Sequence, residues 1–357
     1  MKELFIYAKP KFGGFIKETE IPRKPGPKEV LIKVVYAGLN PKDWKLFTHL
    51  YPQGTIDYDE SQAFNAGDDV AGIIEAVGSE VFEFKPGDRV AGFHQMLNPH
   101  GTFAEYTIIH ASTTFHLPPN ISFEAGASLP LAFMTAAIAI YQGLKVPLPT
   151  TLLEPGSEKT PILIWGGATA VGAFALQLAK LSNLGPIITV AGNGIDFVKS
   201  LNAADHIIDY RTGDVPQKIM AAAGSAKVKL AFDSVSDPRS YEPITEVLVA
   251  SGGGVINMVD PIDDPNWKFP DNVKLTSTMV GSVHGLTWGR VSNEQAKLDT
   301  EFGYWFYRYL SHLLAEGKIK PHPVEILPGG LNGVVEGVQA LFDRKVSAKK
   351  LVARVGN

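Results

Sequence analysis

The chain contains no cysteine among its 357 residues. This absence excludes disulfide bonds, thiol nucleophiles and zinc sites built from cysteine, although a site built from histidine and carboxylate side chains stays open. The sequence also lacks an excess of positive charge, with a formal net charge of −4 and a pI of about 6.2. Nucleic-acid-binding domains usually show a basic excess, so we expect no nucleic-acid partner.

Long hydrophobic runs are missing as well. No uninterrupted apolar run approaches the roughly 18 residues of a membrane-spanning helix, and the opening MKELFIYAKP lacks the sustained apolar core of a signal peptide. We therefore expect a cytoplasmic protein with no membrane partner. With 45% hydrophobic and 20% charged residues, the composition is that of a globular chain long enough for two domains.

One stretch, Pro161 to Lys180, reads PILIWGGATAVGAFALQLAK and predicts a strand, a tight turn and a helix. The apolar run ILIW ends at two consecutive glycines, and apolar residues then resume at helical spacing. The first turn of a helix presents unpaired backbone N–H groups and the positive end of the helix dipole. This arrangement can bind the pyrophosphate of a dinucleotide, although the pattern also fits an ordinary strand-to-helix turn.

The glycine pattern of dinucleotide-binding turns, G-x-G-x-x-G, is only partly kept. The first and third glycines are Gly167 and Gly172, and Thr169 replaces the middle one. A threonine there should hold the phosphates slightly further off or donate its hydroxyl to them. The candidate cofactor-binding residues of this turn are Gly167, Ala168, Thr169, Ala170, Val171 and Gly172.

The regions on either side of this turn differ in character. Residues 1–124 read as short strands punctuated by glycine, as in a small β-barrel. Beyond the turn, predicted strands at 187–191, 206–210, 229–235 and 253–259 alternate with predicted helices near 196–202, 215–223 and 240–250. This alternation predicts an α/β fold with a parallel, doubly wound sheet.

Local pattern leaves two possible catalytic positions open. The polar cluster at 40–45, Asn-Pro-Lys-Asp-Trp-Lys, follows a buried strand, where catalytic residues often lie, but it fits a turn started by Asn-Pro equally well. Thr135 lies in a helix predicted from about 125 to 144, with Ser122 at its cap. A buried helix threonine usually bonds the carbonyl one turn back, so pattern alone favours a structural role.

Two further segments are expected to be structural. We expect 146–161, rich in proline, threonine and charge, to form a surface loop ahead of the glycine turn. The helix predicted near 301–319 carries an apolar stripe that we expect to pack in the core, made of Phe302, Trp305, Phe306, Tyr309 and Leu313.

Motifs spread over the whole chain resemble the medium-chain dehydrogenase/reductase superfamily, in its zinc-free quinone-oxidoreductase-like branch. They are AGLNPKDWK, GDDVAGIIEAVG, FKPGDRVAG, GTFAEY, ASLPLAFMTAA, GGATAVGAFALQLAK, ADHIIDYR and GGLNGVVEGVQALFDRKVSAKKLVARV. Together these motifs are specific, whereas any one of them is not. The loop at 147–160 and the threonine in the glycine turn look most like the fungal trans-acting enoyl reductases of polyketide pathways, of the lovastatin type.

The resemblance implies a division into two domains. Residues 1–124 and 286–357 would form a GroES-like β-barrel substrate domain, and residues 125–285 a Rossmann domain that binds NADP. The active site would then be the cleft between them.

The resemblance also implies that the chain holds no metal. In alcohol dehydrogenases of the superfamily, a cysteine zinc ligand matches Asn40 and a histidine ligand matches Asp68. Asn40 is a poor zinc ligand, and Asp68 alone cannot hold the ion. Alcohol oxidation is therefore not expected, whereas conjugate reduction stays open because hydrogen bonds can hold the charge of an enolate.

Cofactor choice depends on the end of the strand at 187–191. NAD enzymes place an acidic residue there, but this chain has Ala191, Gly192 and Asn193, with no carboxylate before Asp196. By resemblance, Lys199 and Tyr210 match positions that contact the 2′-phosphate. We therefore predict NADPH as the cofactor, with Asn193, Lys199 and Tyr210 among its ligands.

The reaction implied is reduction of the C=C bond of an α,β-unsaturated thioester. Hydride would pass to the β-carbon, and the resulting enolate would be protonated at Cα. Thr135 matches a helix threonine that meets the nicotinamide ribose or the substrate carbonyl, which overturns its structural interpretation. Lys45 matches a lysine that can hydrogen-bond the enolate or a ribose hydroxyl, or it is simply solvated, and Asn40 is expected to orient the loop or the cofactor.

Other functions remain open from sequence. One alternative is an NADPH-dependent quinone or enone reductase that acts on free small molecules. Another is an NADPH-binding interaction protein with little turnover. The enoyl reductase would act on a small or carrier-bound substrate, in fungal secondary metabolism, with a polyketide synthase as partner. The chain could be a monomer or a homodimer.

Overall fold

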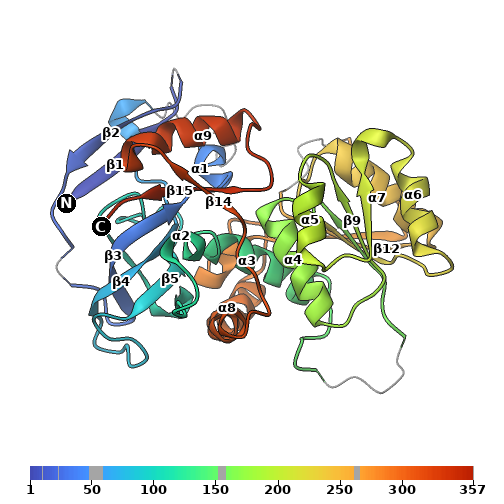
Figure 1. Cartoon of the computed structure of the whole chain (residues 1–357), viewed down its shortest axis with the longest axis horizontal. Helices are drawn as coiled ribbons and strands as arrows, with labels where there is room; N and C mark the ends of the chain where they lie inside the picture. Colours follow the sequence, from blue (N-terminus) through green and yellow to red (C-terminus); the bar gives the residue numbers. More distant parts are fainter. Residues whose placement is uncertain (10, 23, 48–58, 152–157, 261–265, 357) are drawn as a thin grey trace. The chain divides into compact units, whose positions relative to one another are not determined.

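The computed structural model describes residues 1–357 except 10, 23, 48–58, 152–157, 261–265 and 357 (Figure 1). The chain divides into two compact units. The barrel unit comprises Met1–Leu131, Val283–Leu286 and Thr300–Asn357, and the sheet unit comprises Ala132–Ser282 and Thr287–Asp299. Both ends of the chain therefore belong to one unit. Within the loop expected at 146–161, residues 152–157 lie outside the described part of the chain.

The barrel unit is built on a mostly antiparallel sheet of seven strands. Their order is β14 (Val324–Leu327), β15 (Lys350–Arg354), β3 (Glu29–Gly38), β4 (Asp69–Val77), β5 (Arg89–Phe93) and β7 (Thr114–His116), and β6 (Tyr106–His110) also pairs with β3. The separate strands β1 (Lys2–Tyr7) and β2 (Gly13–Glu18) pair with each other. Register shifts along the β3–β4 pair, such as that between Val34 and Tyr36, bend the sheet as β-bulges do.

Strand pairing in this unit brings together two positions that are far apart in the sequence. Gly38 at the end of β3 lies opposite Asp69 at the start of β4. The short helix α1 (Lys42–Lys45) follows β3 directly. The polar residues just after β3 therefore lie beside those at the start of β4.

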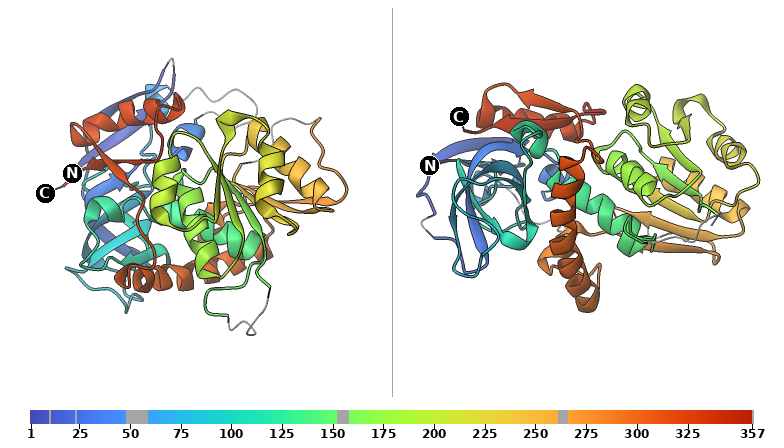
Figure 2. Two further views of the ribbon diagram at one scale, coloured as in Figure 1. Left: turned by 45° about the vertical axis from the view of Figure 1, so that its right-hand side comes forward. Right: turned by 60° about the horizontal axis from the view of Figure 1, so that its bottom comes forward.

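The sheet unit contains a six-stranded, fully parallel sheet. Its order is β10 (His206–Asp209), β9 (Ile187–Ala191), β8 (Ile162–Trp165), β11 (Leu230–Asp233), β12 (Gly254–Met258) and β13 (Val273–Ser277). The connecting helices, which cover both faces of the sheet (Figure 2), are α4 (Ala170–Leu181), α5 (Ile195–Leu201), α6 (Val215–Ala223) and α7 (Pro238–Ala250). The strand order reverses beside β8, and in such sheets ligands bind at the carboxyl ends of the strands there. The predicted doubly wound α/β fold is confirmed.

The helix predicted as one run from about 125 to 144 is broken into pieces. It consists of α2 (Phe123–Gly126), α3 (Pro130–Ala137) and a π-helical segment, Ile138–Gly143. Pro130 has no N–H to donate, so it starts a new helix and does not continue α2. The stretch Phe123–Gly143 is apolar and long enough to cross a membrane, but 83% of its most apolar window is buried, as in a core helix of a soluble protein.

The aromatic stripe expected on α8 (Asn293–Ala315) is only partly buried. Phe306 and Leu313 are fully buried, as expected, but Trp305 is 40% exposed. The ring of Trp305 stacks on Tyr309 at 5.3 Å along the helix surface. The buried face is made of Phe306, Tyr307, Leu310, Leu313 and Leu314. The remaining helix, α9 (Val334–Phe342), packs against α1 in the barrel unit.

Candidate functional site

The turn between β8 and α4 has no room for side chains at its glycines. Gly166 has a φ of +82°, which favours glycine. A Cβ on Gly167 would lie 2.2 Å from Oγ1 of Thr189, and one on Gly172 would lie 2.2 Å from the carbonyl oxygen of Gly166. The first turn of α4 therefore lies directly against the end of β8, and its outward N–H groups can meet a pyrophosphate. The residues at this turn fit a dinucleotide.

Thr169 caps helix α4. Its Oγ1 accepts a hydrogen bond from the N–H of Gly172 at 2.9 Å and lies 2.9 Å from Oγ of Ser234. Ser234 donates its own proton to the carbonyl of Trp165 at 2.8 Å, so the Thr169 hydroxyl donates to Ser234. In this arrangement the threonine fixes the turn, and its proton is already used within the protein.

The predicted adenosine-side residues follow the carboxyl ends of β9 and β10. Tyr210 is 51% exposed, and its ring lies against Gly192, where an added Cβ would be 2.5 Å from Cε1 of the ring. Asn193 Oδ1 accepts a hydrogen bond from Nη1 of Arg211 at 2.5 Å. Lys199 lies on the adjacent helix α5 and pairs with Asp196 at 3.3 Å. These residues therefore gather at one edge of the sheet.

Sequence analysis missed two arginines near this edge. Arg211 forms a two-pronged pair with Asp209, through Nε at 2.8 Å and Nη2 at 2.7 Å, and these hydrogen bonds hold the pKa of Asp209 down at about 2. Arg239, at the start of α7, pairs with Asp237 at 2.6 Å. The motif ADHIIDYR contained Arg211 directly after Tyr210, which was the available signal. Nothing in the sequence links Arg239 to this edge.

Asn40, two residues after the end of β3, has its side-chain polar atoms hydrogen-bonded within the barrel unit. It is 2% exposed; its Nδ2 donates to Asp69 at 2.9 Å, and its Oδ1 accepts from Nζ of Lys350 at 2.6 Å. Its backbone N–H donates to Oδ2 of Asp43 at 2.8 Å. These contacts favour the role of orienting the loop over contact with a cofactor.

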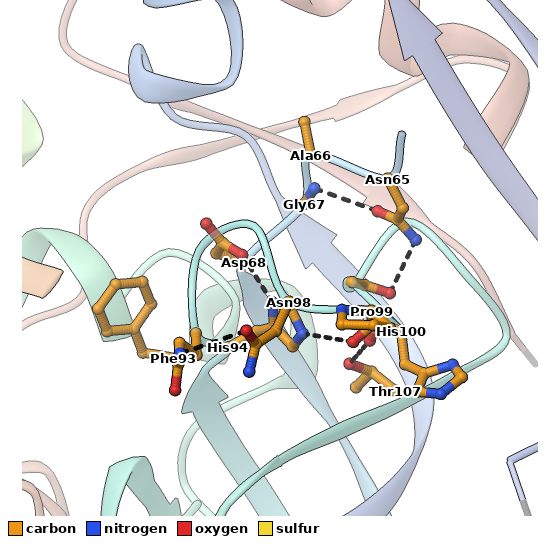
Figure 3. A network of polar contacts seen from close by, with 12 residues as sticks. Asn65, Ala66, Gly67, Asp68, Phe93, His94, Asn98, Pro99, His100 and Thr107 are labelled. Carbon is orange, nitrogen blue, oxygen red and sulfur yellow. Dashed lines mark hydrogen bonds and ion pairs between the residues drawn. The ribbon is translucent and has the colours of Figure 1, made fainter. Parts of the chain in front are cut away.

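A buried charge cluster lies beside Asn40 and was not predicted. Nζ of Lys42 pairs with Asp43 at 3.0 Å and with Asp68, and it donates to the carbonyl of Ala66. Figure 3 shows the far side of Asp68, where its Oδ1 faces Nδ1 of His94 at 2.8 Å. Lys42 was visible in the sequence only as one lysine of the NPKDWK cluster.

This donor set does not fit zinc. Asp68, which matches a zinc-ligand position, already binds a lysine and a histidine, and Asn40 is engaged by Asp69 and Lys350. Within the described part of the chain, no group of three or more histidine, aspartate or glutamate side chains could hold a metal ion.

Of the three proposed catalytic side chains, Lys45 and Asn40 belong to the barrel unit and Thr135 to the sheet unit. Lys45 ends α1 in the barrel unit, with its Nζ 5.6 Å from the ring centroid of Trp44. Thr135 lies in α3 of the sheet unit and is 6% exposed. Asn40 and Lys45 lie in the same turn after β3. The glycine turn, Asn193 and Tyr210 follow the carboxyl ends of the adjacent parallel strands β8, β9 and β10.

Comparison with known proteins gives consistent matches over the chain. Residues 26–119 match the family model of the alcohol dehydrogenase GroES-like domain, and residues 170–290 match that of the zinc-binding dehydrogenases. A trans-enoyl reductase of Gibberella fujikuroi is 38% identical over 93% of this chain and 92% of its own. One from Pyricularia oryzae is 32% identical over 92% and 91%.

Solved structures share the fold at lower identity. The CurK enoyl reductase has a TM-score of 0.71 at 21% identity, covering 99% of both chains. A quinone oxidoreductase of Pseudomonas syringae pv. Tomato has a TM-score of 0.70 at 22% identity, covering 99% of this chain and 100% of its own. At these identities the likeness shows the fold alone.

Proposed function

Because the chain belongs to the medium-chain dehydrogenase/reductase superfamily and to its trans-enoyl reductase family, we propose that it reduces the C=C bond of an α,β-unsaturated polyketide thioester. NADPH would supply the hydride to the β-carbon when bound. The enzyme would act in trans, in the cytoplasm, on acyl chains carried by a polyketide synthase. Its GroES-like β-barrel and Rossmann sheet are the two parts that such an enzyme needs.

The observation that carries this proposal is that the side chains of Asn40 and Asp68 are bonded to other protein side chains. In a zinc alcohol dehydrogenase these positions would hold a Lewis acid for an alkoxide. Here a lysine ammonium binds the Asp68 carboxylate, and both polar atoms of the Asn40 side chain are used internally. Reduction of a conjugated C=C bond suits such a site, because hydrogen bonds can hold the charge that spreads over an enolate.

The residues at the carboxyl ends of β9 and β10 favour NADPH over NADH as the cofactor. No carboxylate follows β9 before Asp196, and that residue pairs with Lys199. Asp209, the acid that ends β10, is paired with Arg211. The edge therefore offers cations and a phenol to a 2′-phosphate, with its nearest carboxylates neutralised.

In this proposal the chain's own side chains bind and orient the substrate. Lys45 donates a hydrogen bond to the thioester oxygen as it gains charge. The Thr135 hydroxyl fixes the substrate carbonyl or the ribose of the cofactor. Asn40 holds the turn that carries Lys45, through its bonds to Asp69 and Asp43.

Product analysis with crotonyl-pantetheine and NADPH tests this proposal. We expect the wild type to form the saturated thioester, detected by mass spectrometry. Lys45→Ala should lower kcat on the order of a hundredfold, the loss typical of removing one donor to a developing oxyanion, and Thr135→Ala should also lower it. Lys33→Ala, which removes an exposed lysine from the preceding strand β3, should leave kcat unchanged. Full turnover in folded Lys45→Ala and Thr135→Ala would contradict the assigned roles.

A further inference from the structure

The side chain of Lys42 ends in a cage of oxygen atoms. Its Nζ lies 3.0 Å from Oδ1 of Asp43 and also contacts Oδ2 of Asp68 and the carbonyl oxygen of Ala66. The carboxylates are almost wholly buried, with exposed fractions of 0% for Asp43 and 1% for Asp68, and the lysine side chain is 15% exposed. Three oxygens from three points of the chain thus converge on one cation.

The hydrogen bonds of His94, which lies on the side of Asp68 away from Lys42, determine the net charge of the Asp68–His94 pair. Nε2 of His94 lies 3.0 Å from the carbonyl oxygen of Pro99, and Nδ1 lies 2.8 Å from Oδ1 of Asp68 (Figure 3). A carbonyl only accepts, so Nε2 carries a proton, and the Nδ1 contact needs a second proton between the ring and the carboxylate. The Asp68–His94 pair is therefore neutral as a whole, which leaves Lys42 to balance Asp43.

Electrostatics agree with this charge count. Burial alone would lower the pKa of Lys42, but the attraction of Asp68 and Asp43 outweighs it and raises that pKa. Burial would likewise raise the pKa of Asp68, yet Lys42 and His94 together lower it. Both groups therefore stay charged near neutral pH, although charges in such a place are costly unless they are paired.

We propose that the Lys42 ammonium is the resident cation of an internal cation site, formed by Asp43, Asp68 and the Ala66 carbonyl, at the place where zinc-binding relatives would hold their metal. The position follows from Asp68, which matches a zinc-ligand position and here binds an ammonium group. A covalently attached cation cannot dissociate and needs no vacant coordination position. It joins the start of β4 to α1 and so holds the turn from Asn40 to Lys45.

A cation site can be distinguished from an ordinary packed lysine by chemical rescue. Lys42→Ala removes three carbons and the ammonium nitrogen, which is the composition of n-propylammonium. The matched uncharged probe is 1-propanol, which has the same shape with a hydroxyl in place of the ammonium. Thermal unfolding of the full chain, followed by circular dichroism with each probe in excess, reports occupancy of the site and requires no activity.

We expect Lys42→Ala to lower Tm by roughly ten degrees, because it leaves the buried Asp43 carboxylate without its counter-charge. n-Propylammonium should restore most of that loss, and 1-propanol should not. The double variant Lys42→Ala/Asp43→Asn, which also removes the carboxylate that Lys42 balances, should lose less stability than Lys42→Ala and should not respond to the amine. Lys33→Ala, on the exposed face of β3, should behave as the wild type with either probe.

Three results would overturn the proposal. The first is a Tm of Lys42→Ala equal to that of the wild type, and the second is equal rescue by amine and alcohol. The third is a double variant that is less stable than Lys42→Ala. If Lys42→Ala is recovered unfolded, its refolding yield with amine against alcohol decides the question with the same expected signs.

Discussion

Three cations near the carboxyl edge of the parallel sheet each pair with an aspartate close in sequence. The pairs are Lys199 with Asp196, Arg211 with Asp209 and Arg239 with Asp237. All three lysine and arginine side chains remain substantially exposed, so the pairs themselves add little to stability. In the proposed function, the 2′-phosphate of NADPH would compete with these aspartates for the same donors.

A substitution at Lys199 tests the preference for NADPH over NADH. We expect Lys199→Ala to weaken NADPH binding about tenfold, because a hydrogen bond to a charged phosphate is lost. NADH binding, measured by the same fluorescence titration, should stay the same, since NADH has no 2′-phosphate. Lys229→Ala removes another exposed lysine of the sheet unit and should change neither affinity. Equal binding of NADH and NADPH by the wild type would refute the cofactor assignment itself.

Asp233, at the end of β11, should make stability depend on pH. Burial raises its pKa to about 6, against the hydrogen bonds that it accepts from Ser240, Ser236 and Val235. The folded state therefore keeps a proton that the unfolded state releases from about pH 4 upward, and stability falls as the pH rises from about 4 to about 6.

Urea unfolding across that pH range checks the sign for Asp233. From about pH 4 to about pH 6, the free energy of unfolding of the wild type should fall by up to about 3 kcal/mol through this group. That of Asp233→Asn should fall correspondingly less. Asp271→Asn, which removes an exposed carboxylate of the same unit, should follow the wild type. Parallel curves for the wild type and Asp233→Asn would show that burial does not shift this carboxyl.

At the scale of elements, the start of α4 depends on its cap. Thr169→Ala removes the acceptor for the Gly172 N–H and should cost about 1 kcal/mol of unfolding free energy. Thr169→Ser keeps the hydroxyl and should retain most of that stability. The midpoint of urea unfolding measures both variants, and equal losses in the two would mean that the hydroxyl does not cap the helix.

The elements of the sheet unit were predictable because each carries a complete local signal. Strands β9 and β10 were predicted within one residue, and α6 as observed, from apolar periodicity. α7 begins two residues earlier than predicted, at Pro238, because Asp237 caps it and proline is favoured in the first turn. The break at Pro130 was missed because a uniformly apolar run hid it.

The charge cluster could not be predicted in the same way. Lys42 and Asp68 are brought together by the pairing of β3 with β4, and His94 by the pairing of β4 with β5. No local period links these three residues. The family resemblance located the positions of Asn40 and Asp68, but it did not indicate the lysine that binds Asp68.

At the scale of the whole molecule, the chain unites a GroES-like β-barrel with a Rossmann sheet. Its fold is shared with a quinone oxidoreductase and with an enoyl reductase at nearly equal TM-scores of 0.70 and 0.71. Fold likeness therefore does not choose between free quinones and acyl thioesters. Our choice of acyl thioesters rests on the trans-enoyl reductase relatives and on the roles proposed for Lys45 and Thr135.

The most direct measurement is NADPH oxidation, followed by its nicotinamide absorbance, with crotonyl-pantetheine and a simple quinone compared side by side on the wild type. Enoyl reduction predicts consumption with the thioester and little with the quinone. Consumption with the quinone alone would contradict the account and assign the chain to the small-molecule reductases, and no consumption with either substrate would contradict it in favour of a cofactor-binding interaction protein.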